Sequence, residues 1–344
     1  THGRSFWILD NITLLRQLTA EVAAAEVFLY RPQLATRVRW NMNTDTPLPP
    51  EEPAAKNPPD GAMIDYHLKS AAKGPVTLEI LDSQGKLVRR YNSADKPEQV
   101  NEKSLDVPTY WIRPPQMLSA DAGVHRFVWD LHYAPPPGGR RSYHIAAILR
   151  DTASEPHGPW AMPAQYLVKL TVDGQSLEQP LTVRMDPRVK TPSHDLAQQF
   201  AVSMQCYQGI QQMHEASLQL RKVRTQLRQL REEAGDRPLG SAIADLDKKL
   251  SALDGRSASR REMMAARSEG ANEPSLNRVH AELVALLDIV QQADLPPTTQ
   301  AVEGSRTLQP QLLGLLSRWR QIKDKDIPAL NERLREGKLN ALSP

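Results

Sequence analysis

The chain has 344 residues, of which 40% are hydrophobic and 24% are charged, a composition typical of globular proteins. Because single domains usually contain about 100–200 residues, this length predicts two cores. The 43 Lys and Arg residues and 40 Asp and Glu residues give a formal net charge of only +3, and no run approaches the roughly 20 apolar residues of a membrane span. We therefore predict neither a nucleic-acid partner nor a transmembrane segment.

The first half of the chain has the composition of a β domain. Most of the 28 prolines fall within residues 46–190, which disfavours long helices there. Apolar and polar residues alternate over 75–81 and over 166–172, and each run is followed by a turn signal and a second short run, as in β-hairpins. With further strands expected near 62–68 and 124–131, the pattern predicts an antiparallel β-sandwich of immunoglobulin or fibronectin type III type.

Three residues near the last of these strands have side chains that bind metals in other proteins. His125, Asp130 and His132 are separated by five and two positions, so Asp130 and His132 are expected on one face of the strand and His125 on the other. A metal site would need another ligand from elsewhere in the chain. We interpret these residues as a solvated strand face and predict no metal site.

Residues 134–163 form a long segment without a clear strand or helix pattern. Segments of this length in compact domains are usually functional or packed on a neighbour. Tyr143, Trp160 and Met162 offer apolar anchors, so we expect the segment to dock on the β domain. The alternative is an exposed, disordered loop.

The second half of the chain, residues 191–344, is expected to be helical. Thr191 is a suitable N-cap, Pro192 suits the first helical position, and the apolar residues that follow step by three and four over about forty residues. One face of this first helix carries a basic stripe that could bind an anionic partner, although neighbouring acidic residues favour a solvated face. The stripe consists of Arg221, Lys222, Arg224, Arg228 and Arg231.

Three more amphipathic segments follow and predict an antiparallel bundle of long helices. They begin near Leu239, Pro274 and Thr298. Pro310 and Pro328 lie in the last segment and are expected to kink or break it. Cys206, the only cysteine, has no basic neighbour to activate its thiol, so we interpret it as a buried helix residue rather than a nucleophile.

Several segments of the chain together form a recognisable set. They are Thr1-His-Gly-Arg-Ser-Phe-Trp-Ile-Leu-Asp10 followed by Leu14-Leu-Arg-Gln-Leu18, Pro75-Val-Thr-Leu-Glu-Ile-Leu-Asp82, Tyr110-Trp-Ile-Arg-Pro114, His125-Arg-Phe-Val-Trp-Asp-Leu131, Tyr166-Leu-Val-Lys-Leu-Thr-Val-Asp-Gly174 and Met185-Asp-Pro-Arg-Val189. This set resembles the C-terminal region of BNR-repeat β-propeller proteins, a sialidase-like and sortilin-like family whose members are often named glycosyl hydrolases. It extends over nearly the whole chain but is weakest in the helical half.

The resemblance implies three segments in this chain and a β-propeller that precedes it in a longer protein. Residues 1–45 would be the end of a β-propeller with its linker, 46–190 a sandwich and 191–344 a bundle. The sequence begins without an initiator methionine, and we expect it to be a piece of a longer bacterial, exported protein whose propeller lies upstream. The family's catalytic residues would lie in that propeller, and none is carried over to a residue of this chain.

The leading functional hypothesis is a non-catalytic accessory region, in which the sandwich supports the propeller and the helices mediate self-association or contact a protein partner. The alternative is that the parent protein is a glycoside hydrolase and that residues 135–163 shape its substrate cleft. A third hypothesis is an adaptor that binds an acidic surface through the basic stripe. No catalytic, cofactor-binding or metal-ligating set is predicted, and the candidate interaction residues are the four stripe arginines, Trp160 and Tyr143.

Overall fold

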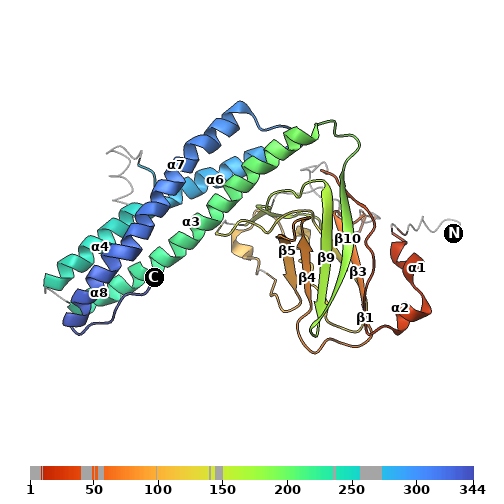
Figure 1. Ribbon diagram of the computed structural model, residues 1–344, viewed down its shortest axis with the longest axis horizontal. Helices are drawn as coiled ribbons and strands as arrows, with labels where there is room; N and C mark the ends of the chain where they lie inside the picture. Colours follow the sequence, from red (N-terminus) through yellow and green to blue (C-terminus); the bar gives the residue numbers. More distant parts are fainter. Residues whose placement is uncertain are drawn as a thin grey trace. The chain divides into compact units, whose positions relative to one another are not determined.

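The computed structural model describes residues 9, 11–39, 49, 51–52, 58–97, 99–138, 141–143, 150–234, 238–255 and 273–344. The contacts divide the chain into two compact units, so the protein is a multidomain protein with a β part and a helical part (Figure 1). The β unit extends to Thr191 without residues 136–138, and the helical unit comprises residues 136–138 and the chain from Pro192. Each unit has its own hydrophobic core.

The smaller sheet of the β unit is antiparallel and has the strand order β1-β3-β6. Its strands are β1 (Val27–Leu29), β3 (Ala62–Leu68) and β6 (Gly123–Trp129). Asp65 on β3 is buried. Arg126 pairs with it from the neighbouring strand β6 and donates two hydrogen bonds to the Asp65 carboxylate, at 2.7 and 3.0 Å. This bidentate pair satisfies a charge that would otherwise be costly to bury.

The larger sheet has the order β2-β10-β9-β4-β5. Its strands are β2 (Ala35–Arg37), β4 (Thr77–Leu81), β5 (Leu87–Asn92), β9 (Ala164–Val172) and β10 (Gln175–Met185). The two predicted hairpins are confirmed as β4-β5 and β9-β10, and Asp173 and Gly174 both adopt positive φ in the second turn. The prediction of purely antiparallel sheets is wrong at one edge, because β2 runs parallel to β10.

The core of the β unit lies between the two sheets. The alternating residues of β4 and β9 point inward as the sequence period predicts, and Leu78, Ile80, Val168 and Leu170 are fully buried. Trp129 at the end of β6 is also fully buried and meets Tyr166 of β9 edge to face at 5.3 Å between ring centroids. Aromatic contacts of this kind join the two sheets.

Two short helices and two strands precede β3. The helices are α1 (Thr13–Gln17) and α2 (Ala20–Ala24). Strand β1 pairs with β3 and strand β2 pairs with β10, so residues 27–37 contribute to both sheets where we expected a linker. The blade-like stretch proposed for residues 1–10 lies outside the described residues except for Leu9.

The remaining elements of the β unit are short. They are the 3₁₀ turns η1 (Glu102–Ser104) and η2 (Thr109–Trp111) and the two-stranded ribbon of β7 (Ser142–Tyr143) and β8 (Ser154–Glu155). The ribbon gives part of the 134–163 segment a regular structure that the sequence pattern did not show. The bond between Glu155 and Pro156 is a cis peptide.

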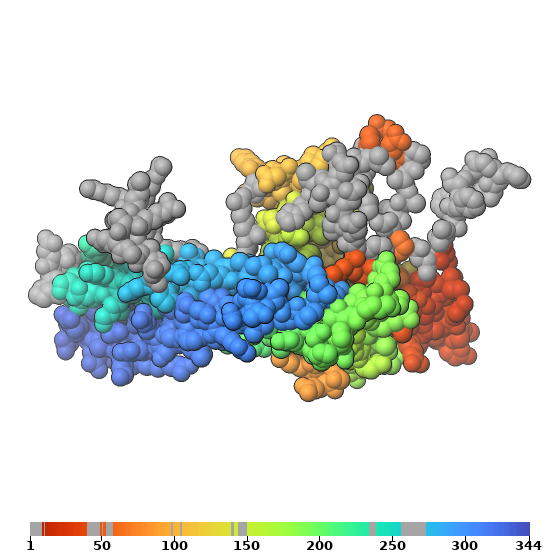
Figure 2. Space-filling view, turned by 90° about the horizontal axis from the view of Figure 1, so that it is seen from above, coloured from red at the N-terminus to blue at the C-terminus, as the bar shows by residue number. Residues whose placement is uncertain are grey.

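The helical unit is built on α3 (Ser193–Ala234), which packs against α4 (Pro238–Asp254), α6 (Leu276–Gln291) and α7 (Thr299–Gln321). Its start lies within two residues of the predicted N-cap. The apolar residues of α3 that are spaced by three and four are buried as predicted, for example Ile210, Leu220 and Leu227. Helices α6 and α7 lie side by side, as Figure 2 also shows.

The ends of these helices follow ordinary capping chemistry. The side chains of Ser275 and Thr298 accept hydrogen bonds from backbone N–H groups at the starts of α6 and α7, and Gly255 ends α4 with a φ of 73°. Cys206 is buried in α3, which confirms the predicted buried helix position, and this burial raises the pKa of its thiol to about 11. Within the described part of the chain, none of the helices is long and apolar enough to cross a bilayer.

The two helix prolines behave differently. Pro310 lies inside α7 without interrupting it, so the expected break there is wrong. Near Pro328 the helix changes to a π-helical turn, η3 (Ile322–Asp326), before α8 (Ile327–Glu336), in which Pro328 occupies the first turn. Pro328 has no backbone N–H to donate, and the change of helix geometry directly before it agrees with the interruption expected at this proline.

Gly61 permits the close approach that starts β3. Its φ is 132°, and a Cβ atom there would lie 2.1 Å from the carbonyl oxygen of Trp129. Gly174 also has a positive φ, of 86°, but a Cβ atom there would meet nothing within 4 Å.

We predict that Gly61→Ala lowers the free energy of unfolding by about 3 kcal/mol, and Gly174→Ala by about 1 kcal/mol. Equal losses in urea denaturation would show that backbone strain alone, without the clash, sets the cost.

Candidate functional site

The candidate site lies where the chain leaves β6. Leu131 adopts a positive φ of 58°, which is unusual for a branched side chain and turns the backbone sharply between Asp130 and His132. The indole N–H of Trp129 donates a hydrogen bond to the carbonyl oxygen of His132 at 3.0 Å and holds this turn on the core. The turn brings together Asp130 and His132, two potential ligands that lie two positions apart in the sequence.

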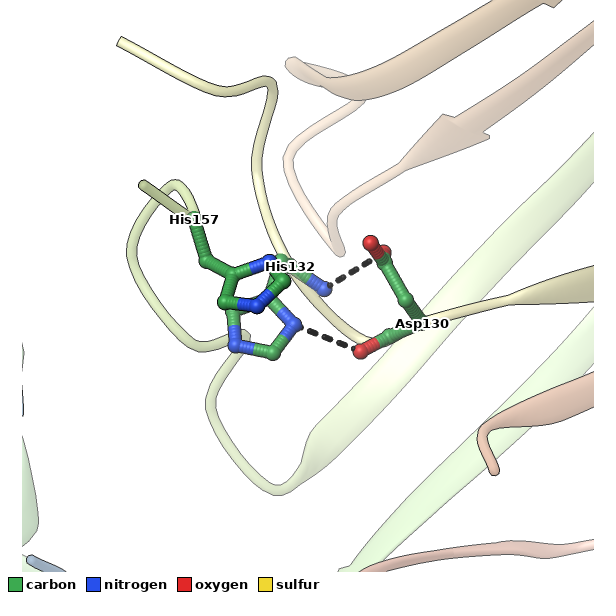
Figure 3. Close-up of side chains that lie close together, drawn as sticks. All are labelled: Asp130, His132 and His157. Atoms are coloured by element: carbon green, nitrogen blue, oxygen red, sulfur yellow. Dashed lines mark hydrogen bonds between the residues drawn. The ribbon is translucent and has the colours of Figure 1, made fainter. Parts of the chain in front are cut away.

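Two hydrogen bonds fix the orientation of His132. Its backbone N–H donates to Asp130 Oδ1 at 3.2 Å, and its Nδ1 lies 2.7 Å from the carbonyl oxygen of Asp130 (Figure 3). A carbonyl oxygen can only accept, so Nδ1 must carry the proton. In the neutral ring the lone pair is then on Nε2.

His157 reaches the same place from the 150–163 segment, which runs beside the turn. Tyr133 N–H donates to Pro159 O at 2.9 Å, and Ala161 N–H donates to Leu131 O at 2.7 Å. Gly158 directly precedes Pro159, and a Cβ atom on it would lie only 2.4 Å from Tyr133 O. Only glycine therefore allows the two backbones to approach so closely. These contacts hold the residue next to His157 against the end of β6.

Together these segments form a cluster of Asp130, His132 and His157 (Figure 3). One donor atom from each residue lies within 4.8 Å of the other two. The two imidazole rings are stacked, with centroids 5.0 Å apart and an interplanar angle of 28°. His132 is buried, Asp130 is half-buried and His157 is exposed, so the cluster opens to solvent on the side of His157.

Trp160 contacts the cluster through His132. Its ring centroid lies 3.8 Å from that of His132, and the two residues form an isolated β-bridge. The guanidinium groups of Arg37 and Arg39 lie over the Trp160 ring at 5.2 and 5.0 Å. Arg37 also donates to Ala161 O at 3.0 Å, which fastens this segment to β2.

The protein surroundings disfavour charge on all three residues of the cluster. Desolvation, assisted by the nearby His157, Arg39 and Arg37, lowers the pKa of His132 well below its usual value. Desolvation also lowers the pKa of His157, although part of its side chain stays exposed, and raises the pKa of Asp130 against the opposing charge of Arg89. These shifts favour the neutral form of both imidazoles, which can donate a lone pair to a metal ion.

The structure changes our interpretation of this region. The solvated strand face is wrong for His132, which has only 7% of its surface exposed. His125 lies apart from the cluster as expected, with Nε2 2.7 Å from Asp121 O and its ring against Tyr66. The missing third ligand, His157, gave no spacing signal; its only hint was its place before Gly158-Pro159 in a segment already expected to dock.

The other predicted interaction residues fall at separate places. Trp160 is docked on the β unit through His132, whereas Tyr143 is half-buried in the β7-β8 ribbon. In the helical unit the side chains of three stripe arginines are exposed, namely Arg221, Arg228 and Arg231. Arg224 instead pairs with Asp247 at 2.8 Å and lies 3.8 Å from the buried Asp254. The stripe is therefore interrupted by an internal ion pair.

Comparisons of the chain with protein-family models, with curated proteins and with solved structures found no match.

The pair between Arg224 and Asp247 gives a stability prediction. Reversing the charge with Arg224→Glu leaves Asp254 buried beside a like charge, so we expect the free energy of unfolding to fall by about 2 kcal/mol. The matched change Arg228→Glu, on the exposed face of the same helix, should stay within about 0.5 kcal/mol of the wild type. Urea denaturation of both variants measures this difference, and equal stabilities would contradict the structural role of Arg224.

The buried imidazole of His132 gives a pH prediction. The unfolded chain takes up a proton near pH 6.5, while folded His132 stays neutral to a lower pH, so the unfolded state binds more protons in this window. Stability is then lost as the pH falls below 6.5, with a slope of up to about 1.4 kcal/mol per pH unit.

His132→Asn keeps a donor near the position of Nδ1 but cannot take up this proton. We expect its unfolding free energy, measured in urea with EDTA at pH 7.5, 6.5 and 5.5, to decline less steeply than that of the wild type. Parallel pH profiles for the two proteins would show that His132 titrates normally in the fold.

Proposed function

We propose that this chain is a non-catalytic accessory and interaction region of a larger, exported protein of the BNR-repeat propeller type. In this proposal the two facing sheets are a sandwich of immunoglobulin or fibronectin type III type that supports an upstream propeller. The helical unit is an antiparallel bundle that mediates association with a second copy of the chain. The sequence resemblance supports the first part, and a surface of the helical unit supports the second.

A shallow groove of about 440 Å³ runs between α3 and α7, and it is the observation that carries the association proposal. Leu313, with 62% of its surface exposed, lines the groove together with the half-buried Leu316 and the buried Trp319. An apolar centre of this kind with a polar rim is the usual anatomy of a protein interface. Water contact with Leu313 would be removed when a second apolar surface covers the groove.

The rim charges favour a second copy of this chain over an unrelated partner. Glu215 lies on the α3 side and Arg320 on the α7 side of the groove, and both are exposed. In a two-fold symmetric pair, one residue contacts the other across the axis and the reverse contact occurs as well. A surface that carries both signs on opposite sides is therefore complementary to itself.

The 135–163 segment supports the accessory hypothesis over the glycosidase hypothesis. A glycosidase cleft uses two carboxylic acids that flank the scissile bond. Within the described residues, this segment instead packs a half-buried anchor, Trp160, on His132 and contributes an imidazole, His157, to a cluster with one carboxylate. Neither feature shapes a sugar-binding cleft by itself.

Association through the groove predicts a concentration-dependent dimer. Leu313→Asp should raise the dissociation constant at least tenfold in sedimentation equilibrium, because it places a charge at the apolar centre. The matched variant Leu218→Asp changes an equally large, half-exposed leucine of α3 that does not line the groove, and it should associate like the wild type. A wild type that stays monomeric at all concentrations, or equal effects of both variants, would overturn the proposal.

A further inference from the structure

We propose that Asp130, His132 and His157 bind a divalent transition-metal ion of the zinc class, and that the ion ties residues 150–163 to the end of β6. The ligands are a carboxylate oxygen of Asp130 and one ring nitrogen from each of His132 and His157 (Figure 3). A solvent molecule would complete a four-coordinate ion on the open side of the cluster. The inference is independent of the proposed association through the helices.

The donor set selects the class of ion. Two imidazole nitrogens and one carboxylate oxygen suit zinc and its neighbours in the first transition series, whereas calcium and magnesium prefer oxygen ligands alone. The chain's single cysteine is in the helical unit, so no thiolate competes for the ion within the β unit. The site therefore fits a borderline cation held by nitrogen and oxygen.

His132 is already arranged as a metal ligand. Ligating histidines almost always donate their second ring N–H to a carbonyl or carboxylate, which fixes the tautomer and the ring orientation. Here Nδ1 makes that bond to the carbonyl oxygen of Asp130 at 2.7 Å, and Nε2 keeps its lone pair. The Trp129 hydrogen bond and the Trp160 ring hold the residue in this position from two sides.

The distances require only a small adjustment. Metal bonds of about 2.0–2.2 Å place tetrahedral ligand atoms roughly 3.3–3.6 Å apart, whereas the three donor atoms lie within 4.8 Å of one another. His157 is exposed and can turn about its side-chain torsions, while His132 and Asp130 stay fixed by their mutual hydrogen bonds. Closing the site therefore moves the one ligand that belongs to the other segment.

The charges around the cluster limit the affinity. Asp130 is the only anionic ligand, and the guanidinium groups of Arg37 and Arg39 lie nearby over the Trp160 ring. A metal ion near these positive charges therefore has a less favourable binding free energy than in a site with several carboxylates or thiolates. We therefore expect a reversible site that EDTA empties without unfolding the protein.

The direct test uses the whole, tag-free chain after EDTA treatment and dialysis. Titration with Co²⁺, followed by its visible absorption, and competition with Zn²⁺ should show one site per chain. Outer ligands of metal sites contribute about 10–100-fold to affinity, so loss of a direct ligand in His157→Ala should weaken Co²⁺ binding about 100-fold or more. Asp130→Asn, which keeps an oxygen acceptor for the His132 N–H, should weaken it as well.

Two matched histidine variants control for binding at other places. His125→Ala removes a half-buried imidazole from β6, and His194→Ala removes a highly exposed one from the helical unit. Both should bind Co²⁺ like the wild type. Circular dichroism establishes that all variants are folded. Lack of stoichiometric binding by the wild type, unchanged binding by His157→Ala, or loss of binding in either control would overturn the site.

Attachment of residues 150–163 to the end of β6 by the metal ion can be measured separately. Arg150 is exposed at the start of the 150–163 segment, so tryptic cleavage after it reports how often the segment detaches. Zn²⁺ should slow this cleavage at least tenfold in the wild type and leave His157→Ala unaffected. Equal rates with and without Zn²⁺ in a wild type that binds the ion would overturn the tie.

Discussion

The hydrogen bond from the Trp129 indole to the carbonyl oxygen of His132 is the interaction on which the rest of the β unit depends. The ring of Trp129 fills the space between the sheets, where it meets Tyr166, and a fully buried indole N–H needs an acceptor. The only way for a residue three positions later to supply it is a sharp turn, which the positive φ of Leu131 provides. A requirement of the core therefore fixes the backbone that presents Asp130 and His132.

The same turn organises the neighbouring segment. Its carbonyl and amide groups pair with Pro159 and Ala161, and its imidazole packs on Trp160. The 150–163 segment is thus held by backbone hydrogen bonds and one large ring, which leaves His157 beside His132. The helical unit has no comparable cluster of donor atoms among its described residues; its notable surface is the leucine-lined groove between α3 and α7. The two units thus offer different kinds of site.

Much of the architecture could be predicted because it is encoded locally. The β9-β10 hairpin follows from alternating residues and an Asp173-Gly174 turn, and α3 follows from a stripe of apolar residues spaced by three and four. Strands β1 and β2 were missed because three residues carry almost no periodic signal and their partners lie far along the chain. The parallel pairing of β2 with β10 depends on the same long-range contact.

The candidate site could be predicted only in part, because it also depends on contacts between residues that lie far apart in the sequence. Asp130 and His132 were recognisable as a pair, but an alternating pattern at the end of a strand does not reveal that the last residues turn into the core. His157 comes from a segment with no periodicity, and its position depends on close backbone packing at Gly158. Ligands brought together by a tertiary turn are invisible to sequence spacing.

The most direct test of this account is the tautomer of His132 in the metal-free protein, measured by long-range ¹H–¹⁵N correlation spectra of the imidazole nitrogens. If the Trp129 turn presents His132 as described, Nδ1 carries the proton and Nε2 shows the shift of an unprotonated nitrogen. A proton on Nε2 would contradict the account, because Nδ1 could then not donate a hydrogen bond to the carbonyl oxygen of Asp130.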